Sequence, residues 1–202
     1  MESTPRDQLD AFDIVLALLH ALRGRSVSRI HIQKALYLAS RRLDRLRDVL
    51  EFARYRMGYW SEDVHDVLEQ LLDNGDVKVV NGLIAPTEQG LDRAREAWGL
   101  LDETEKSVLS EVVDFVSQLS EDELLLYIYV VYGGYEKSDV LERLLRRRKQ
   151  LAFSMYNKGA ISIDMAAKIA GLTIPEFIEY LRRRGIKPFE AVEEDLESAE
   201  RL

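Results

Sequence analysis

Apolar residues recur every three or four positions along most of the chain, which is the spacing of one face of an α-helix. The pattern predicts helices that begin near residues 10, 28, 61, 87, 101, 120 and 138. Ser28, Ser61, Ser120 and Ser138 stand directly at the start of four of these segments, where a hydroxyl side chain caps the free backbone N–H groups of a helix. The sequence therefore predicts a mainly α protein.

One short stretch departs from the helical spacing and predicts a β-hairpin. Val77–Val80 and Leu83–Ala85 are two apolar runs separated by Asn81-Gly82, a pair that favours the type I′ turn of a two-residue hairpin. Three helices followed by a two-stranded hairpin is the order of a winged helix. We therefore expect residues 1–100 to form a winged-helix domain.

Residues 159–185 predict two short helices and the turn between them. Ser162 is expected to cap the first helix, and Gly171 to take a positive φ at the corner. Thr173 and Glu176 have the spacing of a capping box at the start of the second helix. The expected buried positions are Ala166, Ala167, Ile169, Phe177, Ile178 and Leu181. This is the pattern of a helix-turn-helix, whose second helix commonly enters the major groove of DNA, although helical hairpins also serve only for packing.

The run LLLYIYVVYGGY, from Leu124 to Tyr135, is apolar almost all round and predicts a buried helix or an interface element. We interpret its tyrosines as core and interface residues rather than as a platform for stacking bases. These are Tyr127, Tyr129, Tyr132 and Tyr135. A single long helix is expected to follow from Ser138 to about residue 157. Its expected inward positions are Leu141, Leu144, Leu145, Leu151, Ala152 and Met155.

Composition agrees with a globular protein of one or two domains, because 47% of the 202 residues are hydrophobic and 32% are charged. We divide the chain into a winged-helix domain (1–100), a helical connector (101–139), a basic helix with the helix-turn-helix (140–190) and an acidic tail (191–202). The absence of cysteine excludes disulfides and thiolate metal sites. The first ten residues do not have the pattern of a signal peptide, and we expect a cytoplasmic protein.

Charge is distributed unevenly around a net value of −8. Residues 23–59 hold ten basic and three acidic residues, and residues 141–188 hold eleven basic and four acidic residues. Residues 190–202 hold six acidic residues and one arginine. An acidic protein with two segregated basic stretches can still present a cationic face to phosphates, whereas solvated helix faces are the ordinary explanation of such clustering.

Three segments of the first hundred residues resemble a family of small prokaryotic winged-helix domains. They are IQKALYLAS (32–40), YRMGYWSEDVHDVLEQLLDNGDV (55–77) and LIAPTEQG (83–90). That family shows a Y-x-x-G-P-Y-S segment before its third helix. Here Tyr59 holds the proline position and Trp60 the following aromatic, so the match is partial. Some members of that family are associated with toxin–antitoxin or phage-related systems.

The stretch RRKQLAFSMYNKGAISIDMAAKIAGLTIPEFIEYLRRRGIKPFE, followed by EEDLE, resembles a second family over about a quarter of the chain. These are small prokaryotic proteins classed as antitoxins and found beside PIN-domain ribonuclease toxins. The shared positions include Tyr156, Lys158, Gly159, Ile161, Ser162, Ala166, Ala167, Glu176, Phe177, Gly185 and Ile186. The resemblance implies a DNA-binding helix-turn-helix with an acidic tail that contacts a partner. The extension ahead of it is a departure from that family.

The candidate DNA-binding residues follow from the helix-turn-helix. Base readout is assigned to Thr173, Ile174, Glu179 and Arg183. Phosphate contacts are assigned to Lys158, Lys168, Arg182 and Lys187, with Arg146 and Arg147 on the preceding basic helix. Glu176 is committed to the cap. Glu179 and Arg183 also form a favourable i,i+4 pair that needs no DNA to explain it.

The third helix of the winged-helix domain is a poor reader of DNA by its sequence. Its expected exposed residues are all acidic: Glu62, Asp63, Asp66, Glu69 and Asp73. Such a helix would be repelled by the phosphates that flank a groove, so protein contact through dimerisation is at least as good an interpretation. Auxiliary nucleic-acid contacts are assigned instead to Arg23, Arg25, Arg29, Arg41, Arg42 and Arg45.

Catalysis finds little support in the sequence. His20, His31 and His65 lie in three separate helical segments, and metal sites need several convergent ligands. Phosphate-binding glycine loops and the nucleophile-elbow motif are missing. We therefore expect no catalytic residues, no metal and no cofactor.

Two functional hypotheses remain. In the first, the chain is a transcriptional regulator, a homodimer that binds double-stranded DNA through the C-terminal helix-turn-helix. In the second, it is an antitoxin-like interaction module whose acidic surfaces contact a basic protein, such as a PIN-domain toxin. Neither hypothesis involves a membrane. Charge placement supports both, because the C-terminal motif is basic and the winged-helix reader is acidic.

Overall fold

The computed structural model describes residues 9–55, 57–133 and 140–186, which form mainly α-helices and two small antiparallel hairpins. The chain divides into two compact units, Met1–Arg146 and Arg147–Leu202. The first unit contains, in order, α1 (Ala11–Ala21), α2 (Arg29–Ser40), α3 (Asp44–Val49), β1 (Ala53–Tyr55), β2 (Gly58–Trp60), α4 (Glu62–Asp73), β3 (Val77–Val80), β4 (Leu83–Pro86), α5 (Glu88–Gly99), α6 (Glu103–Val116), α7 (Glu121–Tyr132) and α8 (Leu141–Arg146).

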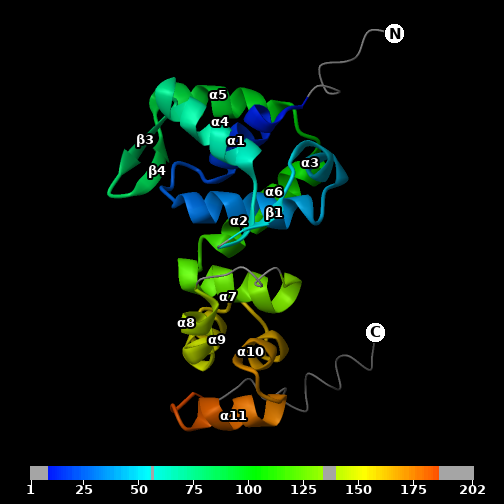
Figure 1. The fold of residues 1–202 in the computed structure, drawn as a ribbon, viewed down its shortest axis with the longest axis vertical. Helices are drawn as coiled ribbons and strands as arrows, with labels where there is room; N and C mark the ends of the chain where they lie inside the picture. The colour runs from blue at the N-terminus through cyan, green and yellow to red at the C-terminus, as the bar shows by residue number, and fades with distance from the viewer. Residues whose placement is uncertain (1–8, 56, 134–139, 187–202) are drawn as a thin grey trace, which may run out of the picture. The chain divides into compact units, whose positions relative to one another are not determined.

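The core of the first unit is built around α1, which packs against α4, α5 and α6 (Figure 1). Its residues from Ile14 to Leu19 are at most 3% exposed, so the helix is buried on nearly every side. The segment that the sequence assigns to a connector joins this core, because α6 packs on α1 and α2, and α7 packs on α2 and β2.

The predicted hairpin is present, with Val77 opposite Pro86 and Val80 opposite Leu83 in the antiparallel register of β3 and β4. Asn81 and Gly82 both have positive φ, 52° and 79°, as a type I′ turn requires. The segment between α1 and α2 also joins this sheet, because Val27 and Ile84 exchange two backbone hydrogen bonds of 3.0 and 2.8 Å.

A second hairpin, β1–β2, was not predicted from the sequence. Ala53 pairs with Trp60 and Tyr55 with Gly58. Two side chains of α2 hold its second strand in place. Gln33, fully buried, donates to the Ser61 carbonyl (2.8 Å) and accepts from the Ser61 N–H (3.0 Å), and the Lys34 ammonium donates to the Tyr59 carbonyl (2.5 Å).

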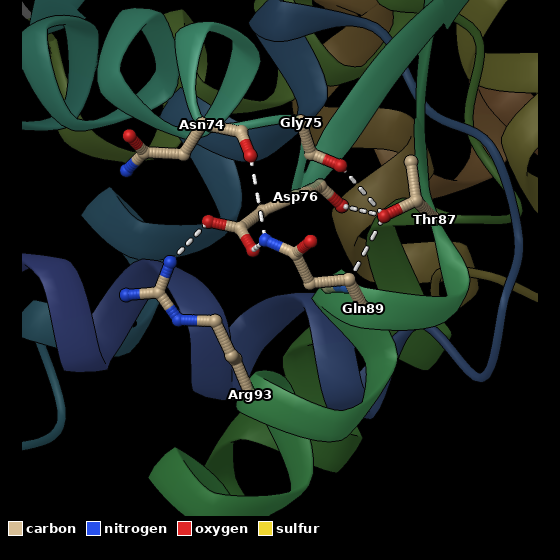
Figure 2. A network of polar contacts seen from close by, with 7 residues as sticks. Asn74, Gly75, Asp76, Thr87, Gln89 and Arg93 are labelled. Carbon is tan, nitrogen blue, oxygen red and sulfur yellow. Dashed lines mark hydrogen bonds and ion pairs between the residues drawn. The ribbon is translucent and has the colours of Figure 1, made fainter.

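Asp76, which is fully buried, connects the end of α4 to the start of α5 (Figure 2). Its carboxylate accepts hydrogen bonds from Arg93 and from the Gln89 amide (3.0 Å). The Thr87 hydroxyl donates to the carbonyls of Gly75 (2.8 Å) and Asp76 (3.0 Å), and it caps α5 by accepting from the Gly90 N–H (3.1 Å). A buried carboxylate is tolerated here because each of its oxygens has a partner.

The second unit contains α9 (Arg148–Asn157), α10 (Ile163–Ala170) and α11 (Ile174–Arg182), and α10 packs against both other helices. The prediction of one long helix from Ser138 to residue 157 is wrong. Ser138 lies outside the described residues, and the chain leaves helical geometry at Arg147 (φ −105°, ψ 4°) between α8 and α9. The break separates leucines of two cores, because Leu144 is buried in the first unit and Leu151 in the second.

The burial of several side chains differs from the prediction. Leu145, expected inward, is 40% exposed on α8, and Ile178, expected to be buried on α11, is only half-buried. Tyr129 is buried as expected, whereas Tyr127 and Tyr132 are half-buried and Tyr135 lies outside the described residues. Within the described ranges, no helix combines the length and apolar character that a membrane span requires.

Candidate nucleic-acid interface

The turn between α10 and α11 has the predicted geometry. Gly171 adopts a left-handed conformation (φ 68°, ψ 39°) and ends α10. Its N–H donates to the Lys168 carbonyl (3.1 Å), and the Leu172 N–H donates to the Ala167 carbonyl (3.0 Å). These two bonds make a Schellman motif, which satisfies helix-end carbonyls and turns the chain sharply toward α11.

Arg148 of α9 reinforces this turn, which sequence reasoning missed. Its guanidinium donates to the carbonyls of Ile169 (2.7 Å) and Lys168 (3.2 Å), at the negative end of the α10 dipole. A Cβ atom on Gly171 would lie 2.5 Å from this guanidinium. The contact joins residues about twenty positions apart, so no local spacing reveals it.

The start of α11 carries the predicted capping box. The Thr173 hydroxyl accepts from the Glu176 N–H (3.4 Å), and the Glu176 carboxylate accepts from the Thr173 N–H (2.8 Å) and hydroxyl (2.8 Å). The hydrogen bonds from Thr173 lower the pKa of Glu176 below its ordinary value, with a smaller contribution from Lys149. Glu176 is therefore an ionised cap, as the sequence predicts.

The buried face of α11 is aromatic. Phe177 and Leu181 are fully buried, and the Phe177 ring meets Tyr156 of α9 edge-on with centroids 6.0 Å apart. The Arg184 guanidinium lies 3.7 Å from the centroid of the Tyr180 ring, and thus holds the end of the helix through a cation–π contact. Phe153 of α9 also meets Tyr180 edge-on. These contacts leave the opposite face of α11 to solvent.

The predicted reading residues are exposed, although Ile174 lies three residues before the buried Phe177 and therefore on the same side of α11. Thr173, Ile174, Glu179, Arg182 and Arg183 are all exposed, and Ile174 is 41% exposed although it is apolar. Glu179 and Arg183 form the predicted i,i+4 ion pair at 3.0 Å, with both side chains more than half exposed. An ion pair in this position is weak in water, so either partner can exchange the other for a ligand at small cost.

The predicted phosphate contacts divide between the two units. Lys158 and Lys168 are exposed on the second unit, together with Arg147, whereas Arg146 is exposed on the first unit and pairs with Glu142 at 3.1 Å. Lys187 lies outside the described residues. The described residues of the second unit, 147–186, hold eight basic and three acidic residues, a net charge of +5. This part of the chain is cationic within an acidic protein.

A hollow of about 460 Å³ lies beside the outer face of α11, which the sequence did not predict. Lys149 of α9 and Arg183 contribute the cationic side chains of its lining, and Glu176 and Glu179 the anionic ones. Tyr180 and Pro175 supply apolar surface. Lys149 therefore lines the same hollow as Glu179 and Arg183, two of the predicted reading residues.

Four of the six auxiliary arginines of the first unit are paired with carboxylates. Arg25 pairs with Asp114 (3.1 Å), Arg42 with Glu111 (2.8 Å) and Arg45 with Glu105 (3.3 Å), and Arg29 pairs with Glu69. Hydrogen bonds from Arg42 and then Ser107 lower the pKa of Glu111. Arg23 and Arg41 are exposed. Four of the ten basic residues of 23–59 are therefore paired with acidic residues from other parts of the chain.

The five acidic residues of α4 are exposed, as the sequence predicts: Glu62, Asp63, Asp66, Glu69 and Asp73.

The histidines do not converge. His31 is held between the Ser28 hydroxyl (2.9 Å) and the Leu119 carbonyl (2.8 Å), and the His20 ring stacks on Trp98. Within the described residues, no group of three His, Asp or Glu side chains has the arrangement of a metal site.

Comparison with known proteins finds a family match for the region that contains α9, α10 and α11. Residues 136–200 match the family described as "Uncharacterised protein family (UPF0175)". A UPF0175 protein of Aeropyrum pernix is 45% identical over 60 residues, which cover 28% of this chain and 67% of that relative. The chain belongs to the UPF0175 family.

A UPF0175 protein of Halobacterium salinarum is 38% identical over 63 residues. The aligned segment covers 27% of this chain and 64% of the halobacterial protein, so the chain spans slightly less than two thirds of the length of that relative. The match to the UPF0175 family lies in the C-terminal region, where the sequence shows its second resemblance. Membership alone assigns no activity to the residues described above.

Proposed function

We propose that this chain is a DNA-binding transcriptional regulator that reads duplex DNA through the helix-turn-helix formed by α10 and α11. The observation that supports it most is the solvent face of α11. Thr173 and Ile174 are exposed at the N-terminal end of this helix, on a unit whose described residues carry a net charge of +5. The N-terminal residues of a recognition helix are those that contact base edges in the major groove.

The side chains of α11 are suited to different base contacts. Ile174 offers an exposed apolar surface of the kind that contacts a thymine methyl group. Glu179 accepts from a cytosine amino group and Arg183 donates to guanine once their mutual ion pair opens. Lys158, Lys168, Arg182 and Lys187 are assigned to phosphates, with Arg146 and Arg147 as further cationic contacts. The proposal gives the chain no catalytic role.

We assign the first unit to the winged-helix class. Helices α1, α2 and α4 precede the β3–β4 hairpin, and Val27, between α1 and α2, pairs with Ile84 of that hairpin. The acidic surface of α4 argues against DNA contact through this helix. We therefore propose that the winged helix supports a homodimer, in which two α11 helices read the half-sites of one operator.

The proposal is tested by fluorescence anisotropy with labelled duplex DNA, from about 50 to about 300 mM salt. Each phosphate contact adds about −0.9 to the slope of log affinity against log salt. We expect tight binding at low salt, with a slope that reports several contacts. Absence of binding at the lowest salt concentration would contradict the proposal.

Substitutions locate the binding surface. Arg182→Ala together with Arg183→Ala is expected to weaken binding and to reduce the salt slope by about 1, because Arg182 is assigned to a phosphate and Arg183 to a base. The matched control is Arg25→Ala with Arg42→Ala, which removes the same charge from arginines already paired with carboxylates. Equal losses in the two double variants would mean that net charge, and not α11, determines the affinity.

An antitoxin-like interaction module is the second candidate function. It is favoured by the acidic surface of α4, by the net charge of −8 and by the acidic segment at 190–202. The pairing of four arginines in the first unit with carboxylates also reduces the cationic surface there. Such surfaces complement a basic partner, and a PIN-domain toxin is the partner that the C-terminal resemblance implies. Co-purification with that partner should weaken when residues 190–202 are deleted, and an unchanged complex would count against this function.

A further inference from the structure

A hollow of about 500 Å³ lies in the first unit among residues of α2, α3, β2 and α7 and the segments between them. Its volume is within the range of small-molecule sites, about 300–1,000 Å³. Its lining combines four aromatic rings, from Tyr37, Phe52, Tyr59 and Tyr132, with charged groups. None of these rings has a role in the proposed contact with DNA.

The aromatic wall is held in place by contacts within the protein. The rings of Tyr37 and Tyr59 stack with centroids 4.2 Å apart and an interplanar angle of 10°. Phe52 and Tyr132 meet Tyr37 edge-on, at 5.5 and 5.7 Å. Tyr37 is buried, whereas Phe52, Tyr59 and Tyr132 are partly exposed. Three rings therefore present surface around a fixed central one.

Tyr59 is held by hydrogen bonds at its backbone carbonyl and at its side-chain hydroxyl, as well as by stacking of its ring. Its backbone carbonyl accepts from the buried Lys34 ammonium (2.5 Å), and its hydroxyl donates to the Tyr132 carbonyl (3.3 Å). The hollow thus has its shape before a ligand enters, which lowers the entropic cost of binding. Burial, followed by a hydrogen bond with Tyr59, raises the pKa of Tyr37, so this phenol stays neutral at physiological pH.

The charged groups of the lining are two arginines and one glutamate. Arg41, Arg47 and Glu51 are all exposed. Arg47 pairs with Asp44 at 2.6 Å, but both side chains are more than half exposed and the pair is i,i+3 on one short helix. Such a pair contributes little in water, so Arg47 can exchange Asp44 for the anionic group of a ligand. Glu51 provides an acceptor for an N–H group.

We propose that this hollow binds a small planar aromatic molecule that carries an anionic group and an N–H donor. The ring packs against Phe52 and Tyr59, the anion binds Arg41 and Arg47, and the donor faces Glu51. Nucleotides and free aromatic amino acids share this chemistry. The site is separate from α11, and ligand binding here does not require that the chain bind DNA.

Calorimetric titration of the full chain tests the proposal with two pairs of probes. AMP and L-tryptophan carry the anion, and adenosine and 3-methylindole are uncharged counterparts that lack it. We expect at least one anionic probe to bind with a Kd below about 1 mM, and its neutralised counterpart to bind about tenfold more weakly. Binding of AMP would identify the nucleotide source, and binding of tryptophan the amino-acid source. Absence of heat from both anionic probes at about 5 mM would overturn the proposal.

Substitutions assign the binding to this hollow. Arg41→Gln with Arg47→Gln should lower the affinity for the anionic probe about tenfold. The affinity for the counterpart that lacks the anion should not change. The matched control is Arg25→Gln with Arg95→Gln, which removes two exposed arginines, paired with Asp114 and Asp92, that do not line the hollow. Phe52→Leu should lower the affinity for both the anionic probe and its counterpart, since it removes the contact between the Phe52 ring and the ligand ring. Thermal melting confirms that each variant is folded, and unchanged affinity in the double variant would overturn the assignment.

Discussion

Gly90 of α5 lies close against the backbone of Asp76, in the chain segment after α4. A Cβ atom there would lie 1.8 Å from the backbone carbonyl oxygen of Asp76, a distance that no packing adjustment of a side chain relieves. The same carbonyl accepts from the Thr87 hydroxyl, and the Asp76 carboxylate holds Gln89 and Arg93. The buried Asp76 network and the absent side chain of Gly90 therefore depend on each other.

Gly90→Ala is expected to destabilise the first unit by about 2 kcal/mol or more, the range of overpacked interiors. Alanine in an open helical position has the opposite effect, since it stabilises by about 0.5–1 kcal/mol relative to glycine. Gly99→Ala in the same helix is the control, because a Cβ atom added at Gly99 would have no atom within 4 Å. Urea unfolding measures both variants, and equal stability of the two would contradict the close approach.

Lys34 is a buried cation, 1% exposed, whose ammonium donates to the Tyr59 carbonyl. Burial lowers the pKa of Lys34 from 10.5 to about 8. Between these two pH values the unfolded chain binds a proton at Lys34 that the folded chain does not. The free energy of unfolding must then rise with pH in this window.

We predict that raising the pH from 8 to 10 increases the free energy of unfolding by about 2 kcal/mol through Lys34. Above pH 10 the raised pKa of Tyr37 lowers the free energy of unfolding as the pH rises. The reason is that Tyr37 of the unfolded chain releases its proton at a lower pH than Tyr37 of the folded chain. Lys34→Met should abolish the rise. Urea titrations of both proteins at pH 8, 9 and 10 measure it, and parallel pH profiles would show that Lys34 stays charged in the fold.

At the scale of elements, helix starts were the most predictable part of the fold. Ser28, Ser61, Ser120, Ser162 and Thr173 cap helices in the structure, because each carries the local signal of an N-cap. The turn of β3–β4 and the corner at Gly171 were predicted for the same reason. In each case, the information lies within about four residues of sequence.

Elements defined by distant partners were not predictable. The strands β1 and β2 have only three residues each, and all of β1 is exposed, so no alternation of apolar and polar residues marks it. The pairing of Arg42 with Glu111 and the capping of α10 by Arg148 join residues far apart in the chain. For the candidate site, the sequence therefore predicted the exposed face of α11 but missed the contacts that position this helix.

The α10–α11 turn provides a test at the scale of elements. Gly171→Ala is expected to cost about 1–2 kcal/mol for its left-handed conformation, and further stability because Arg148 must leave two carbonyls. Gly159→Ala is the control, since Gly159 has nearly the same φ, 71°, with no atom within 4 Å of an added Cβ. The difference between the two free energies of unfolding, measured in urea, reports the Arg148 contact. A difference of zero would show that Arg148 moves at no cost.

At the scale of the whole molecule, the two basic stretches of the sequence differ in how far carboxylates pair with their basic residues. In the first, four of the ten basic residues are paired with carboxylates that belong to α4 and α6. The described part of the second, residues 141–186, holds ten basic and four acidic residues, a net charge of +6. An overall charge of −8 therefore coexists with one unit whose described part is cationic. This distribution favours contact with an extended polyanion, such as a nucleic-acid backbone, through the second unit rather than the first.

Deletion of residues 190–202 removes six acidic residues and one basic residue, which changes the net charge from −8 to −3. If the chain binds DNA, we expect the deletion to tighten binding at about 50 mM salt, since long-range repulsion of phosphates falls. The gain should shrink by about 300 mM salt, where screening is stronger. Anisotropy titrations measure both values. Weaker binding on deletion would show that the segment itself contributes to the DNA contact.

The pairing of Val27 with Ile84 has a kinetic consequence. Each residue donates its amide hydrogen to the carbonyl of the other, so both amides are protected between segments that are far apart in the sequence. Their hydrogens should exchange with deuterium only when the first unit opens as a whole, because neither bond survives separation of the two segments. Amide exchange at these two positions would thus report the global opening of this unit, with no label or substitution required.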